Sequence, residues 1–64
     1  MNVQEQIRIR EVIRQRLIVM ESDMRALIHE TSAPQNGGYI SAAVIFNLAR
    51  LLETIADVRN HLDQ

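Results

Sequence analysis

Apolar side chains recur at spacings of three and four residues in two separate parts of the chain, which is the period of one face of an α-helix. In the first part, residues 3–30, the stripe consists of Ile9, Ile13, Leu17, Met20, Met24 and Leu27. In the second part, residues 41–62, it consists of Ile45, Leu48, Leu52, Ile55 and Leu62. Arg59 occupies the one position that this second stripe leaves without an apolar side chain. The pattern predicts two amphipathic helices.

The segment between the two helices holds the only proline and both glycines of the chain. Pro34 lacks a backbone N–H, so it ends the first helix before it, and Asn36-Gly37-Gly38 can turn the chain. Ser41 is a favourable N-cap for the second helix. Two helices joined by about ten residues predict an all-α antiparallel hairpin, and we expect residues 1–64 to form a single domain.

The predicted hairpin carries more apolar surface than one helix–helix contact can cover. Apolar residues make up 47% of a 64-residue chain without cysteine, so disulfides cannot compensate for a small core. A large exposed apolar patch is unusual for a monomer. We therefore expect a homo-oligomeric helical bundle, a dimer or higher, whose subunit interface includes Val12, Val19, Ala42, Phe46, Ala49, Leu51 and Ala56.

The cationic side chains, seven in number, are all arginine, and four of them lie between positions 8 and 16. A guanidinium group is suited to phosphate and carboxylate groups. Folding the chain about residue 36 would bring Arg59 near the first-helix arginines at the open end of the hairpin. The candidate ligand-binding residues are Arg10, Arg14, Arg16 and Arg59, with Tyr39 of the loop available to stack on a flat ligand. Alternatively, these arginines form ion pairs between subunits with Glu5, Glu11, Asp57 or Asp63.

Several classes of function find no support in the sequence. It has no nucleophile–base pair and no set of metal ligands, so we expect neither catalysis, a metal nor a cofactor; His29 and His61 would lie at opposite ends of the hairpin. The net charge of −1 argues against a nucleic-acid partner. No apolar stretch is long enough to span a membrane and no signal peptide is evident, so we expect a cytoplasmic protein.

Residues 26–51 resemble the hairpin of phage anti-CBASS sponge proteins, which are small helical oligomers that sequester cyclic nucleotides without chemistry. The similar positions are Ala26-Leu27-Ile28-His29-Glu30, Pro34, Ser41-Ala42-Ala43 and Leu48. The resemblance implies an oligomeric protein that captures an anionic nucleotide signal.

A second resemblance is to the small needle-subunit co-chaperones of type III secretion. It rests on Arg14-Gln15-Arg16-Leu17 and Ala49-Arg50-Leu51-Leu52. It implies a protein–protein module, such as a co-chaperone or small regulator, that covers an amphipathic helix of its partner. Both binding functions stay open at this point.

Overall fold

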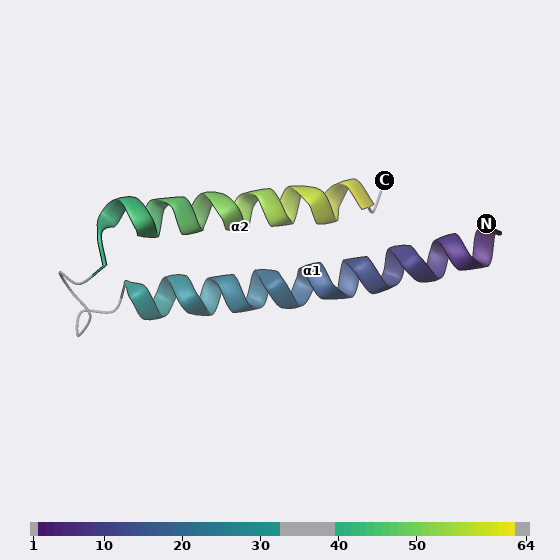
Figure 1. Ribbon diagram of the computed structural model, residues 1–64, viewed down its shortest axis with the longest axis horizontal. Helices are drawn as coiled ribbons and strands as arrows, with labels where there is room; N and C mark the ends of the chain where they lie inside the picture. Colours follow the sequence, from purple (N-terminus) through teal and green to yellow (C-terminus); the bar gives the residue numbers. More distant parts are fainter. Residues whose placement is uncertain (1, 33–39, 63–64) are drawn as a thin grey trace.

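The computed structural model describes residues 2–32 and 40–62, which form two α-helices, α1 (Val3–Thr31) and α2 (Ala42–Leu62). The helices lie side by side and run in opposite directions (Figure 1). The predicted all-α antiparallel hairpin is confirmed. The predicted ranges, 3–30 and 41–62, each differ from the observed helix by one residue at one end.

Side-chain caps explain where the two helices begin. The Asn2 Oδ1 accepts a hydrogen bond from the Glu5 N–H at 2.8 Å, and the Ser41 Oγ accepts one from the Val44 N–H at 3.3 Å. Each bond satisfies a backbone donor that has no partner within its own helix. The predicted N-cap role of Ser41 is therefore confirmed.

One side of α1 faces α2. The residues of α1 that are buried or half-buried recur at spacings of three and four, and they are Arg14, Leu17, Glu21, Met24, Ile28 and Thr31. We call this series the inner stripe. On α2, the predicted stripe of Ile45, Leu48, Leu52, Ile55 and Leu62 is buried or half-buried throughout, and so is Arg59.

The stripe predicted for the first helix was partly wrong, because only Leu17 and Met24 of it belong to the inner stripe. The other four side chains are exposed, with exposed fractions between 41% for Leu27 and 48% for Met20. A second series of residues with the same spacing as the inner stripe therefore runs along α1, shifted by about one residue. The second series consists of Ile9, Ile13, Arg16, Met20, Asp23 and Leu27, and we call it the outer stripe.

The hairpin alone has almost no core. Among the described residues only Ile55 and Glu21 are buried. The accessible surface of the chain is 5213 Å², whereas a compact protein of this mass exposes about 4,200 Å². The radius of gyration is 15.5 Å, against about 11 Å for a compact chain of 64 residues. The molecule is a rod of 52 × 15 × 14 Å.

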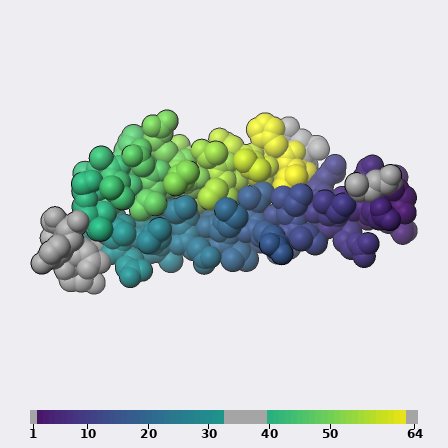
Figure 2. Space-filling model, viewed as in Figure 1, coloured from purple at the N-terminus to yellow at the C-terminus, as the bar shows by residue number. Residues whose placement is uncertain are grey.

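The N-terminal part of α1 extends past the end of α2 (Figures 1 and 2). α1 has 29 residues and α2 has 21, and the difference corresponds to about 12 Å of helix. Val3, Ile7 and Val12 in this part have exposed fractions of 68%, 59% and 51%. The extension therefore carries apolar side chains that α2 does not cover.

Candidate functional site

An ion pair joins the two helices near the C-terminal end of α2. The Arg59 Nε donates to the Glu21 Oε2 at 2.6 Å, and the Arg59 Nη2 donates to the Glu21 Oε1 at 3.3 Å. The exposed fraction of the Glu21 side chain is 3%, and that of Arg59 is 28%. Two parallel hydrogen bonds of this kind fix both the distance and the orientation of the groups.

A second guanidinium group reaches the same carboxylate. The Arg25 Nη2 lies 3.7 Å from the Glu21 Oε1, one helical turn along α1, as expected for a glutamate four residues before an arginine. The hydrogen bond from Arg59 holds the pKa of the Glu21 carboxyl below its ordinary value of 4.5; burial acts in the opposite direction, and the charges of Arg59 and Arg25 add to the lowering. Glu21 is therefore an ionised carboxylate at neutral pH.

Glu21 is a partner of Arg59 that the sequence analysis did not name. We expected Arg59 near Arg10, Arg14 and Arg16, with an anionic ligand or one of four other carboxylates as its partner. Its guanidinium group binds Glu21 of the same chain. Glu21 was missed because the sequence pattern placed it beside the apolar stripe. An arginine within the stripe of one helix was the available signal, because it calls for a carboxylate on the facing helix.

The other candidate arginines lie on two sides of α1. Arg10 lies four residues before Arg14, the first member of the inner stripe, and continues that stripe toward the N-terminus. Arg14 is half-buried and its Nε lies 3.8 Å from the Glu11 Oε2, whereas Arg10 is exposed. Arg16 is also exposed and belongs to the outer stripe. Tyr39, the fifth candidate, lies outside the described residues.

The predicted interface residues differ in how far the hairpin already covers them. Val12, Val19, Phe46 and Leu51 have exposed fractions of 51%, 58%, 65% and 51%. Ala42 is exposed as well, while Ala49 and Ala56 are half-buried. The larger side chains of the set are thus still available for contact with another molecule.

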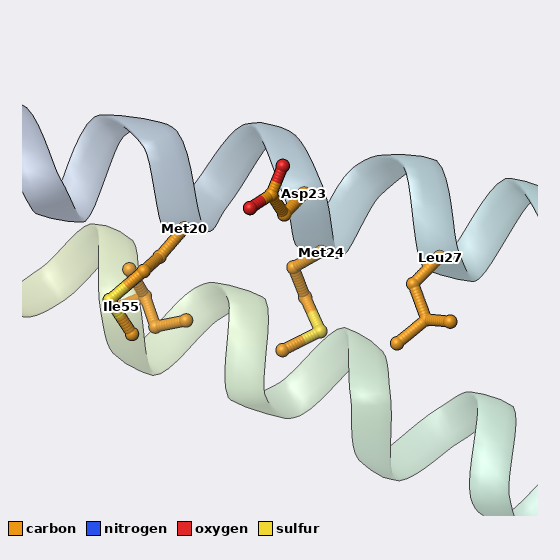
Figure 3. A pocket seen from close by; sticks show the side chains of 5 residues that line it. All are labelled: Met20, Asp23, Met24, Leu27 and Ile55. Atoms are coloured by element: carbon orange, nitrogen blue, oxygen red, sulfur yellow. The ribbon is translucent and has the colours of Figure 1, made fainter.

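Two hollows follow the outer stripe. The first has a volume of about 400 Å³ and is lined by Gln15, Arg16, Val19 and Met20. The second, of about 190 Å³, lies between the helices and is lined by Met20, Asp23, Met24, Leu27 and Ile55. In Figure 3, Met24 and Leu27 point toward α2, whereas the Asp23 carboxylate points away from it. Met20 lines both hollows, so the surface along the outer stripe is uneven.

Residues 2–32 and 40–62 include no group of three histidine, aspartate or glutamate side chains placed to hold a metal ion. Neither described helix is sufficiently long and apolar to cross a membrane. The His61 Nδ1 lies 2.7 Å from the Asp57 carbonyl oxygen on the same helix. This contact lies in the last turn of α2, where a histidine side chain interacts favourably with the backbone carbonyl groups.

Comparison with protein-family models, with curated proteins and with solved structures gives no match for this chain.

Proposed function

We propose that this chain is a non-enzymatic binding protein that acts as a homo-oligomer and holds an anionic nucleotide on arginines at the open end of its hairpin. Such a protein sequesters its ligand and releases it unchanged, as the resemblance to the phage sponges implies. The observation that carries the proposal is the position of Arg10 and Arg14 on the inner-stripe side of the first helix.

The charge distribution supports an anionic ligand at this end. Residues 1–16 hold four arginines and two glutamates, for a balance of +2, although the whole chain has a net charge of −1. Arg10 and Arg14 lie one turn apart, so both guanidinium groups can reach one phosphate or two neighbouring phosphates. Arg59, bound to Glu21, and Arg16, on another side of α1, are left out of this site.

The exposed apolar surface supports the oligomer. Each described large aliphatic side chain of the outer stripe is at least 41% exposed, and Val44, Leu51 and Val58 of α2 are about as exposed, at 47–51%. Among the described residues Ile55 is the only buried apolar one, so the hairpin gains little stability as a monomer. Burial of these side chains between copies supplies the missing core.

A thermal-shift screen against cyclic di- and trinucleotides tests the ligand, because a ligand selective for the folded state raises the melting temperature. We expect Arg10→Met and Arg14→Met to weaken binding about tenfold or more, since each removes a charged donor. Arg50→Met, which changes an exposed arginine of α2, is the matched control and should bind normally. The proposal fails if no nucleotide raises the melting temperature or if both variants bind like the wild type.

The same exposed apolar surface favours a second candidate, a module that covers an amphipathic helix of another protein. The two candidates differ in how the purified chain behaves alone. A closed homo-oligomer supports the sponge. A poorly behaved monomer that becomes soluble only with a partner helix supports the interaction module.

A further inference from the structure

We propose that the outer stripe of α1 is the seam of a two-fold dimer, in which α1 packs antiparallel against α1 of a second copy and Arg16 of each copy pairs with Asp23 of the other. This inference rests on the proposed homo-oligomer and names the contact that builds it.

The spacing of the outer stripe is that of a coiled-coil seam. Its members follow one another at intervals of 4, 3, 4, 3 and 4 residues from Ile9 to Leu27, which is the repeat that lets two helices pack along their length. The two hollows that Met20 lines are open on this surface. Side chains of a second helix can enter them as knobs enter holes.

The charges within the stripe select the direction of the second helix. Arg16 and Asp23 are exposed, and neither makes an ion pair with any other residue in the described part of the chain. A parallel pair of α1 helices would set Arg16 against Arg16 and Asp23 against Asp23. An antiparallel pair about an axis between Val19 and Met20 sets each arginine against an aspartate. Like charges in contact oppose association, and opposite charges fix the register.

The same register uses the extension of α1. With Arg16 opposite Asp23 of the second copy, Ile13 lies opposite Ala26 and Val12 lies opposite Leu27. The N-terminal part of one α1 thereby runs along the C-terminal half of the other. This half carries an excess of acids: residues 17–31 hold one arginine and three carboxylates, for a balance of −2, against +2 for residues 1–16. Opposite ends of the two copies are therefore brought together.

The area available matches what a dimer needs. The chain exposes 5213 Å², about 1,000 Å² more than a compact protein of its mass. A stable interface of standard size removes about 800 Å² from each partner. We expect a seam along α1, together with the neighbouring apolar residues of α2, to bury an area of about this size. The result is a four-helix arrangement of two hairpins.

Disulfide cross-linking tests the direction of the helices in the intact chain, which has no cysteine of its own. Met20 lies next to the two-fold axis, so we expect Met20→Cys to form a disulfide-linked dimer on mild oxidation. Ile9 is equally exposed, at 46% against 48% for Met20, but its two copies lie about 30 Å apart in the antiparallel pair. Ile9→Cys is therefore the control and should stay reduced. A cross-linked Ile9→Cys dimer, or no cross-link with either cysteine, overturns the pairing.

A charge exchange tests the register. We expect Arg16→Asp and Asp23→Arg each to raise the dimer dissociation constant about tenfold or more, because each sets two pairs of like charges against one another. The double variant restores both pairs of opposite charges. Its dimer dissociation constant should lie within about threefold of the wild-type value. Arg50→Asp, the same charge change on α2, should have little effect. Failure of the double variant to recover overturns the register.

Sedimentation equilibrium gives these dissociation constants. Interference optics are used because a chain with one tyrosine and no tryptophan absorbs ultraviolet light weakly. The outcomes separate this inference from the proposed function. A wild-type chain that stays monomeric rejects the homo-oligomer itself. An oligomer that fails the cross-linking and charge-exchange tests rejects only this pairing, and nucleotide binding through Arg10 and Arg14 is measured independently of both.

Discussion

At the residue scale, the pairing of Glu21 with Arg59 is the most specific contact in the hairpin. A nearly buried carboxylate with two hydrogen bonds from one guanidinium group leaves few other positions for the helices. A slip of α2 along α1 by one turn would bury the carboxylate without its partner, which is strongly unfavourable. We therefore infer that the pair sets the register between α1 and α2, while the aliphatic side chains supply the attraction.

The first prediction concerns this carboxylate. Glu21→Gln removes the charge that holds Arg59, so we expect the melting temperature near neutral pH to fall by several degrees. The pKa of Glu21 is lower in the folded chain than its ordinary value of 4.5. The ionised pair therefore stabilises the fold above about pH 4.5, and this contribution is lost as the pH falls through the folded-state value. The difference in melting temperature between the wild type and Glu21→Gln should therefore disappear in that acid range.

The control for this prediction is Glu53→Gln, which removes the charge of an exposed acid of α2. It should leave the melting temperature nearly unchanged, because exposed charges contribute little to stability. Melting curves recorded at the same protein concentration across the acid range provide the measurement. A gap that stays constant with pH, or an equal effect of Glu53→Gln, would show that Glu21 does not act through its charge.

Residue-scale detail is also where prediction from sequence was weakest. Glu21 and Met20 are neighbours, and each belongs to a series with the spacing of a helix face. Hydrophobicity alone favours the series with Met20. In the structure the other series is the more buried one, and its Glu21 carboxylate binds Arg59 of α2. A single pattern of apolar positions does not reveal which of two overlapping stripes a given partner covers.

At the element scale, both helices could be predicted within one residue at each end. The reasons are local: a regular apolar period over many turns, a proline and two glycines gathered between the helices, and a serine at the start of the second. The predicted contact stripe of α2 was also confirmed, because its apolar residues form one dominant series. α1 has two such series, and α2 covers the second less completely than the first.

The second prediction belongs to α2. Ser41→Ala removes the side-chain oxygen that accepts the Val44 N–H, and the loss of an N-cap costs about 1 kcal/mol of stability. Ser41→Asp keeps an acceptor at this position and should retain most of the stability. Urea unfolding followed by circular dichroism at one protein concentration measures the difference. Equal midpoints for the alanine and aspartate variants would exclude a capping role.

At the scale of the whole molecule, two amphipathic helices of unequal length form a rod with a small contact and a large apolar remainder. The sequence could predict this excess of apolar surface, since 47% apolar residues in 64 positions exceed what one helix pair buries. The gathering of arginines in the first helix was also evident from the sequence. Which of these arginines lie on the side of α1 that faces α2 depends on how α1 is rotated against α2, and this rotation is a tertiary property.

Self-association is the central claim, and the mass of the purified chain in solution tests it most directly. Multi-angle light scattering during size-exclusion chromatography at micromolar concentration gives this mass without reference to shape, which matters for a rod. The chain has a mass of 7.4 kDa. We expect one helical species with a mass at least twice that of the chain. A helical species that elutes with the mass of a single chain at every concentration would contradict the account.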